Sequence, residues 1–300
     1  MWVVLAFVSA VCLGFYDICK KIALRENGVV EVLTASVLIS SGILIVPLVL
    51  SRFAPEMMLA TPFYVPRLDW QGHLLTFLKS VIVLSSWVFA YMSLKHLPIS
   101  VVSPWQATRP MWTLVGALVL FGERLNAWQW TGVALAIGSL LLFSLHSRFS
   151  PVKRNSMSPS DKRYYICLAL AILIGSCSGL YDKYMMRRFD HNAVQVYYTF
   201  YQAAMMLILY AIHSRHASAR PLTTVLPVIL ISVFLVMSDN VYMLALQDPD
   251  SMIAIVSTIR RGGVVIGFAY GLIVLKEAKG ASACMLGVLL GLICLAMGSM

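Results

Sequence analysis

The chain has 300 residues, of which 60% are hydrophobic and only 12% are charged. Soluble domains carry about 25% charged residues, so this composition excludes an ordinary soluble protein and indicates one that lies in a lipid bilayer. The formal net charge of +10 is explained by basic loops beside anionic lipid, and we expect no nucleic-acid partner.

Apolar segments long enough to cross the roughly 30 Å hydrocarbon core of a bilayer recur along the whole chain. In chain order they lie at 2–24, 30–51, 73–95, 98–121, 126–146, 164–186, 192–214, 224–246, 251–275 and 279–299. Helices satisfy their own backbone hydrogen bonds at this length, and the alternating pattern of a membrane barrel does not occur. We therefore expect an all-α membrane protein with ten transmembrane helices, the first of which is not a cleaved signal peptide.

Two pairs of motifs indicate that the chain contains an internal repeat. CLGFYD at 12–17 corresponds to CSGLYD at 177–182, and YMSLKHLPIS at 91–100 aligns without a gap to YMLALQDPDS at 242–251. Self-similarity of this kind is typical of a duplicated structural unit.

The polar, basic segment 147–163 separates the two copies, so we expect repeats at 1–146 and 164–300. Each repeat holds five predicted helices. Because this number is odd, the second copy must enter the membrane in the opposite sense to the first. Inverted repeats of this kind are the architecture of secondary transporters, which bind substrate near the middle of the membrane between the two copies.

Arginines occupy matching positions of the two repeats, and each lies beside residues that weaken a helix. Arg109 stands between two prolines in SPWQATRPMW, and Arg260 and Arg261 precede two glycines in STIRRGGVV. Interrupted helices in corresponding places of two halves indicate a transport site, and guanidinium groups bind carboxylate or phosphate bidentately. We predict that these arginines bind an anionic or zwitterionic substrate; the alternative is a structural pairing with acidic residues at membrane depth.

Other polar and aromatic residues are predicted to lie at a similar depth. A charged side chain at the bilayer centre costs at least about 2.5–3.5 kcal/mol on insertion scales, so such residues face the bundle interior and usually have a function. Aromatic rings suit the planar or apolar part of a ligand, although Trp and Tyr are also common at membrane interfaces. The further substrate-binding candidates are Lys79, Trp87, Tyr91, Trp105, Asp239 and Tyr242.

The repeated aspartates form a second group of candidates, for coupling or gating. Lys21 lies four residues after Asp17, the spacing at which the two side chains share a helix face. Asp182 repeats Asp17, but methionines replace the lysines that follow it. One aspartate would carry a coupling proton, or the pair would form salt bridges that fix the register between helices; both interpretations stay open.

The remaining polar positions predict no further chemistry. Glu123 and Glu277 lie between predicted helices, where an acid beside the first turn of the following helix favours its positive end, so we interpret both as structural. The six cysteines all fall within predicted helices and have no C-x-x-C spacing. We therefore expect no metal site and no cofactor, and the absence of a catalytic cluster at the ends of the predicted helices indicates that the chain is not an enzyme.

The five plus five predicted helices, a first helix with an acid and lysines near its end, and GERLNAWQWTGVALAIGSLLL at 122–142 resemble the drug/metabolite transporter superfamily, EamA type. The family's G-E motif before the fifth helix is Gly122-Glu123 here, whereas the second copy reads Lys276-Glu277 and lacks the glycine. The resemblance implies an exporter of amino acids, other metabolites or drugs, with a central cavity lined by helices 1, 3, 4, 6, 8 and 9.

These observations predict a secondary active transporter that exports a small anionic or zwitterionic, amino-acid-like metabolite by alternating access. We expect it in a cell membrane, the bacterial inner membrane, as a multi-pass monomer with protons as candidate coupling ions. Three alternatives remain: export of cationic drugs or amines, flipping of a phosphorylated lipid carrier, and a non-transporting membrane sensor or scaffold.

The orientation of the chain stays open, because two indications disagree. Most basic loop residues lie on the side of the segment 147–163, which the positive-inside rule places in the cytoplasm, with both termini outside. The family resemblance implies termini in the cytoplasm instead.

Overall fold

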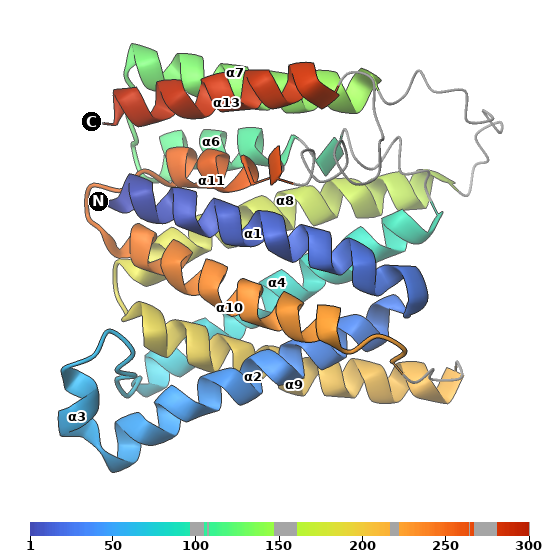
Figure 1. Cartoon of the computed structure of the whole chain (residues 1–300), viewed down its shortest axis with the longest axis vertical. Helices are drawn as coiled ribbons and strands as arrows, with labels where there is room; N and C mark the ends of the chain where they lie inside the picture. Colours follow the sequence, from blue (N-terminus) through green and yellow to red (C-terminus); the bar gives the residue numbers. More distant parts are fainter. Residues whose placement is uncertain are drawn as a thin grey trace. The chain divides into compact units, whose positions relative to one another are not determined.

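The computed structural model of the chain describes residues 1–96, 105–106, 108–146, 161–216, 222–263, 265–266 and 281–299. Every regular element among these residues is a helix, which confirms the predicted all-α class for this part of the chain (Figure 1). The helices are α1 (Trp2–Glu26), α2 (Val29–Phe53), α3 (Pro55–Leu59), α4 (Trp70–His96), α6 (Arg109–Leu120), α7 (Ala127–His146), α8 (Asp161–Met186), α9 (His191–His216), α10 (Leu226–Gln247), α11 (Ile253–Arg261) and α13 (Ala281–Gly298).

The helix bounds differ from the predicted segments in three places. The described helices α6 and α11 cover only part of the predicted segments 98–121 and 251–275. The short helix α3 was not predicted; it begins at Pro55, a residue suited to a first turn because no intrahelical bond needs its missing N–H there. Helix α8 begins at Asp161, inside the predicted linker 147–163, whose earlier part lies outside the described residues.

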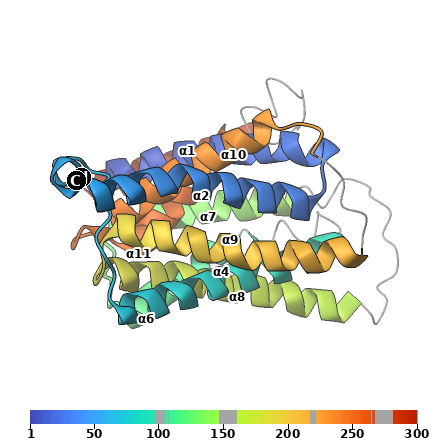
Figure 2. The ribbon, with the colours of Figure 1, turned by 90° about the horizontal axis from the view of Figure 1, so that it is seen from below.

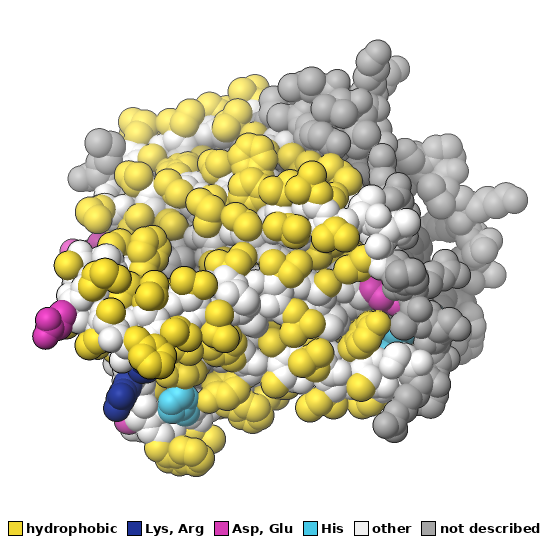
Figure 3. Space-filling view, turned by 60° about the horizontal axis from the view of Figure 1, so that its bottom comes forward, with side chains coloured by type: hydrophobic (Ala, Val, Ile, Leu, Met, Phe, Trp, Pro, Cys, Tyr) yellow, Lys and Arg dark blue, Asp and Glu magenta, His cyan; other side chains and the backbone are white. Residues whose placement is uncertain are grey.

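Several of the described helices are suited to a membrane. Five stretches are long and apolar enough to cross it: Trp2–Leu24, Val29–Phe53, Trp70–Ala90, Lys162–Met186 and Leu226–Gln247. Two shorter apolar helices, Arg109–Leu120 and Leu286–Gly298, accompany them. Hydrophobic side chains cover most of the face drawn in Figure 3, with few charged side chains among them. The chain is therefore a multi-pass membrane protein, because exposed apolar surface on this scale requires lipid rather than water.

The chain divides into two compact units, and the first combines Met1–Val81 with Tyr184–Pro249. In this unit α1 packs along α10, and α2 packs against α9 and α10 (Figures 1 and 2). Serines bring α1 and α10 close together: Ser9 Oγ donates to the backbone oxygen of Ser238 at 2.8 Å, and Ser238 Oγ donates to the backbone oxygen of Ser9 at 3.0 Å. Small polar residues of this kind are typical of helix contacts within membranes.

The second compact unit combines Ile82–Lys183 with Asp250–Met300. Its closest helix pair is α7 with α13, where Gly132 and Gly291 face each other. A Cβ atom on Gly132 would lie 2.8 Å from the backbone oxygen of Gly291, and one on Gly291 would lie 2.8 Å from that of Gly132. The two backbones therefore touch, which only residues without a side chain allow.

Neither compact unit is a continuous half of the sequence. The first unit holds α1, α2 and the beginning of α4 together with α9 and α10, and the second holds α6 and α7 together with α8, α11 and α13. Helices from before and after the linker are thus packed together in both units. The inverted repeat itself, at 1–146 and 164–300, stays a prediction.

Candidate functional site

The predicted arginines lie at the ends of helices rather than in their middles. Helix α6 begins at Arg109, with Pro110 in its first turn, where proline is tolerated. Helix α11 ends at Arg261, and turns follow at Gly262 and Gly263. Helix ends are thus found at the positions where proline and glycine were expected to weaken the helices. Pro104, the other proline of the motif, lies outside the described residues.

Helices α6 and α11 pack together in antiparallel fashion, and Glu123 fixes this arrangement. Just after α6 ends, the Glu123 carboxylate accepts hydrogen bonds from the backbone N–H groups of Ile253 at 2.6 Å and Ala254 at 3.1 Å. The end of α6 therefore lies at the beginning of α11. Because the helices also pack along each other, Arg109 and Arg260 lie together at the opposite end of the pair.

Arg109 is half-buried and contacts α8. Its Nη2 donates to the backbone oxygen of Gly175 at 2.5 Å, and Ser176 Oγ donates to the backbone oxygen of Arg109 at 3.1 Å. A Cβ atom at Gly175 would lie 2.6 Å from the Arg109 Cζ atom, so glycine is needed where the guanidinium rests on α8. Arg260 is also half-buried and Arg261 is exposed.

A buried lysine holds the beginning of α11 from the side of α8. Lys183 has 0% exposed surface, and its ammonium donates to the backbone oxygen of Ser251 at 2.7 Å and to the Ser251 hydroxyl. The neighbouring Asp182 is 7% exposed. Burial of a charged group is costly unless it is paired and hydrogen-bonded, so this contact favours a structural role for Lys183.

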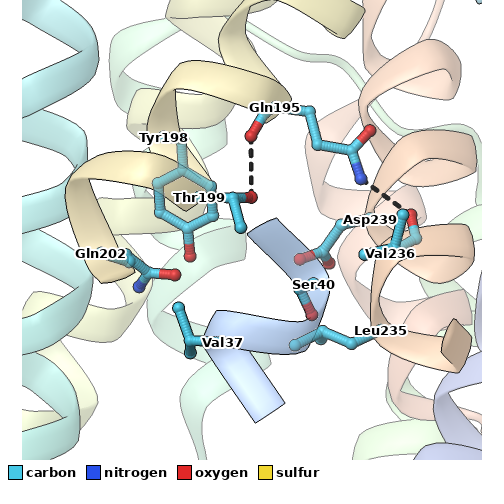
Figure 4. A pocket seen from close by; sticks show the side chains of 9 residues that line it. All are labelled: Val37, Ser40, Gln195, Tyr198, Thr199, Gln202, Leu235, Val236 and Asp239. Atoms are coloured by element: carbon cyan, nitrogen blue, oxygen red, sulfur yellow. Dashed lines mark hydrogen bonds between the residues drawn. The ribbon is translucent and has the colours of Figure 1, made fainter. Parts of the chain in front are cut away.

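A polar pocket lies inside the first compact unit, between α2, α9 and α10 (Figure 4). Its lining residues are Val37, Ser40, Gln195, Tyr198, Thr199, Gln202, Leu235, Val236 and Asp239. We call it the α2–α9–α10 pocket. It includes Asp239, one of the predicted substrate-binding residues.

Lys79 reaches the same group of residues from α4. Its side chain is only 2% exposed, and its ammonium lies 4.5 Å from the centroid of the Tyr198 ring. One residue further along, Ser80 Oγ donates to the backbone oxygen of Tyr198 at 3.3 Å. The cation is stabilised by the negative face of the ring, so Lys79 adds a buried positive charge beside a residue that lines the pocket.

The comparison with known proteins agrees with the membrane fold. Residues 1–145 match the model of the EamA-like transporter family. The match covers slightly less than half of the chain. A solved structure described only as "Crystal structure of protein" is similar over 99% of this chain and 96% of its own, with a TM-score of 0.75 and 13% sequence identity. No protein with a curated description matches the chain.

The match agrees with the EamA-type resemblance over the first of the two predicted repeats. At 13% identity, the solved structure shows likeness of fold alone. It extends that likeness along almost the whole chain, beyond the residues that match the EamA-like family.

The aromatic candidates have different environments. Trp105 is 38% exposed, with its ring centroid 6.4 Å from that of Tyr165, whereas Tyr242 on α10 is only 4% exposed. Trp87 is half-buried on α4. Tyr91 belongs to the same helix, but its side chain lies outside the described residues. The described rings therefore differ in exposure, and their exposure does not assign them to one cavity.

The repeated aspartates also differ from each other. Asp17 on α1 is exposed, whereas Asp182 on α8 is buried. We expected both to face the bundle interior, and this stays a prediction. The side chain of Lys21 lies outside the described residues, and the predicted contact between Lys21 and Asp17 stays a prediction.

The prediction for Glu123 was right about the role and wrong about the helix. Its carboxylate caps α11, not the helix that follows it in the sequence. That following helix, α7, has a capping box of its own: Asn126 Oδ1 accepts from the N–H of Gln129, and Gln129 Oε1 accepts from the N–H of Asn126, both at 2.9 Å. Glu277 lies outside the described residues, so its role stays a prediction.

Sequence reasoning missed the neutral residues of the pocket. Ser40, Gln195, Thr199 and Gln202 carry no charge, and each belongs to a helix with many other polar side chains. A signal was present in QVYYTFYQ at 195–202, where two glutamines lie seven residues apart and so on the same face of a helix.

Proposed function

We propose that this EamA-like protein is a secondary transporter that exports a small anionic or zwitterionic, amino-acid-like metabolite by alternating access. The observation that carries the proposal is the position of the arginines, at the same end of the antiparallel pair α6 and α11 and at the interrupted ends of both helices. Helix interruptions expose backbone groups and free side chains to meet a ligand within a membrane.

The chemistry of guanidinium supports an anionic group on the substrate. Arg109 and Arg260 are charged at every physiological pH, and each offers a planar fork of donors that matches a carboxylate or phosphate. In surroundings of low polarity, such charged hydrogen bonds are stronger than in water. Arg261, which is exposed, is the third member of this group.

Packing between the helices supports the proposed inverted repeat of two times five helices. Three of the described helix pairs join elements that occupy equivalent places in the predicted repeats: α2 with α9, α6 with α11, and α7 with α13. A pair of oppositely inserted copies would make such contacts about a shared axis. In this proposal an ion or substrate gradient across the membrane supplies the energy, and Asp17, Lys21 and Asp182 are candidates for coupling or gating.

The test compares the metabolites exported by cells that overproduce the wild type, Arg109→Ala, Arg260→Ala or Arg187→Ala. We expect the first two variants to lower export of the affected metabolite by about 10- to 100-fold, since a hydrogen bond to a charged group contributes about 1.5–3 kcal/mol. Arg187, an exposed residue just after α8, is the matched control and should leave export unchanged.

Arg109→Lys separates charge from geometry, because lysine keeps the positive charge but cannot form the bidentate contact. Each variant is purified in detergent and its elution profile and Tm are measured, so that a folding defect is recognised. Export that stays at the wild-type level in both alanine variants would contradict the assignment of the arginines to the substrate.

A further inference from the structure

The segment between α2 and α4 exposes large hydrophobic side chains. Phe53 ends α2 and is 85% exposed, and Trp70 begins α4 and is 82% exposed. Between them, Met57, Leu59 and Phe63 are exposed as well. We call residues 53–70 the α2–α4 connection. Because a group of exposed apolar side chains marks a contact surface, we expect something other than water to cover it.

The backbone of the connection is firmly held, so the exposure of these side chains does not come from a loose loop. Val65 is 1% exposed; its N–H donates to Ser51 Oγ at 3.0 Å, and its backbone oxygen accepts from Arg52 Nη1 at 2.9 Å. From α9, Asn192 Nδ2 donates to the backbone oxygen of Pro62 at 2.8 Å. The connection is thus attached to α2 and to α9.

The exposed apolar surfaces of both neighbouring helices run into the connection. On α2 the exposed residues are Val46, Val49, Leu50 and Phe53, and on α4 they are Trp70, Leu74, Phe77 and Leu78. Residues three, four and seven apart share a helix face, so each set forms one stripe along its helix, and such apolar stripes face lipid in a membrane protein. One stripe ends at Phe53 and the other begins at Trp70. The connection therefore lies where the lipid-facing surfaces of α2 and α4 end (Figure 1).

Charged side chains exclude the hydrocarbon core as the place of the connection. Glu56, Arg67 and Asp69 are exposed, and Arg52 just before the connection is half-buried. A charge at the bilayer centre costs at least about 2.5–3.5 kcal/mol on insertion scales, whereas Trp is enriched at membrane–water interfaces. The boundary between lipid and water accommodates both kinds of side chain, since charged groups reach water there while rings contact acyl chains.

The balance of charge indicates which kind of membrane surface fits. Residues 52–70 contain two basic and two acidic side chains and so carry no net charge. A basic segment gains about 1 kcal/mol per Lys or Arg near an anionic membrane surface, and this segment has no basic surplus. Its contact is therefore apolar and aromatic, which fits a bilayer of zwitterionic lipid.

We propose that the α2–α4 connection lies in the lipid–water boundary of the bilayer, with Phe53, Phe63 and Trp70 in contact with lipid. The connection is then an interfacial anchor and not a loop in the surrounding water. This inference goes beyond the proposed transport function and does not depend on it.

The anchor has a consequence for the depth of α2 in the membrane. Helix α2 has 25 residues and is about 37 Å long at 1.5 Å per residue, which exceeds the hydrocarbon core of roughly 30 Å. A helix of this length can tilt or extend into the interface, and interfacial residues decide which. With Phe53 held at the boundary, the surplus length of α2 lies toward its other end or is taken up by tilt.

The experiment measures the depth of Trp70 in nanodiscs of phosphatidylcholine. The chain has seven tryptophans, so the fluorescence of Trp70 is obtained by subtracting the spectrum of Trp70→Phe from that of the wild type. Bromine atoms on the lipid chains, near the headgroup or near the chain end, quench from within the bilayer, and iodide quenches from water. We expect loss of most Trp70 emission with bromine near the headgroup, and less with bromine at the chain end or with iodide.

Two added tryptophans extend the measurement, both in the Trp70→Phe protein. Phe63→Trp places a reporter in the middle of the connection and should show the same quenching by brominated lipid. Arg187→Trp places one at an exposed position just after α8 and is the control, which iodide should quench and brominated lipid should not. The elution profile and Tm of each variant are measured, so that a folding defect is recognised.

The possible outcomes separate lipid from other partners. Strong quenching by iodide and none by brominated lipid at Trp70 and Phe63→Trp would place the connection in water and overturn the proposal. Protection from both quenchers would show that protein covers the connection, a second copy or another chain, and would also overturn it. Phosphatidylglycerol added to the nanodiscs should leave the quenching unchanged, and quenching that appears only with this anionic lipid would contradict an apolar contact.

Discussion

Glu123 connects parts of the chain that are 130 residues apart, because its carboxylate accepts hydrogen bonds from the first N–H groups of α11. Helix N-termini carry unsatisfied N–H groups and a partial positive charge. A carboxylate at this position therefore both accepts hydrogen bonds and interacts favourably with the helix dipole. The family's G-E motif has a structural role here, because the glutamate orders the helix that ends in Arg260 and Arg261.

Removal of this carboxylate should destabilise the protein measurably. We expect Glu123→Ala to lower the free energy of unfolding by about 1–2 kcal/mol, the usual cost of a lost cap. Glu123→Gln should cost less, since its amide oxygen can still accept one hydrogen bond. The Tm in detergent checks both variants, with Glu56→Ala on the exposed helix α3 as the control. Equal Tm values for Glu123→Ala and the wild type would contradict the capping role.

At the scale of the helix, the contact between α7 and α13 depends on the absence of side chains. Gly132→Ala and Gly291→Ala should each destabilise the protein by about 1–3 kcal/mol, because an added methyl group would overlap backbone atoms of the facing helix. Gly138, also on α7, has nothing within 4 Å of the site of a Cβ atom.

Gly138→Ala is thus a control with the same chemical change on the same helix. It should leave the Tm unchanged or raise it, since alanine favours a helix by up to about 1 kcal/mol over glycine. Equal shifts of the Tm in all three glycine variants would contradict the role of Gly132 and Gly291 in the close packing of α7 and α13.

The helices themselves could largely be predicted, because length and apolar composition decide whether a segment fits a bilayer. The predicted segments 2–24 and 30–51 lie within α1 and α2, and differ from their bounds by two residues or fewer at each end. The arginine-bearing segments were harder. Their prolines and glycines predicted a weakness, but not that α6 would begin at Arg109 and α11 end at Arg261, because the neighbouring helices decide where each one stops.

Most of the pocket could not be predicted for a different reason. Charged residues in an apolar helix are conspicuous, so Asp239 and Lys79 were found. Ser40 and Gln202 are not conspicuous, because many serines and glutamines in helices bond to their own backbone. Their place in the pocket wall depends on the packing of three helices that are far apart in the sequence.

At the scale of the whole molecule, the two compact units combine helices from both sides of the predicted linker. Neither 1–146 nor 164–300 contains all the helices of either unit. Expressed alone, each fragment should therefore fail to fold, whereas the two expressed together should associate, because their apolar contacts form between fragments. Co-purification through a tag on one fragment, followed by size-exclusion chromatography, checks this. A stable, monodisperse fragment 1–146 on its own would contradict the prediction.

The sequence predicts a repeat because matching residues keep matching spacing, as in CLGFYD at 12–17 and CSGLYD at 177–182. How the repeats are divided between the compact units was not visible, since no motif records which helices exchange partners. Asp17 and Asp182 show this: the letters repeat, while one side chain is exposed and the other is buried. A duplication predicts which positions of the two copies correspond. It does not predict the burial or the contacts of each corresponding side chain.

The bridge from Glu123 to α11 also governs motion. Because Glu123 is hydrogen-bonded to the beginning of α11, a displacement of α6 would carry α11 with it. The guanidinium groups of Arg109 and Arg260, at the other end of the pair, would then move together. Gly122, at the end of α6 away from the arginines, has a φ of +63°, a left-handed conformation that glycine adopts without strain. In the proposed transport cycle, α6 and α11 would therefore move as one unit. The substrate would be released by tilting of this pair rather than by separation of its two arginines.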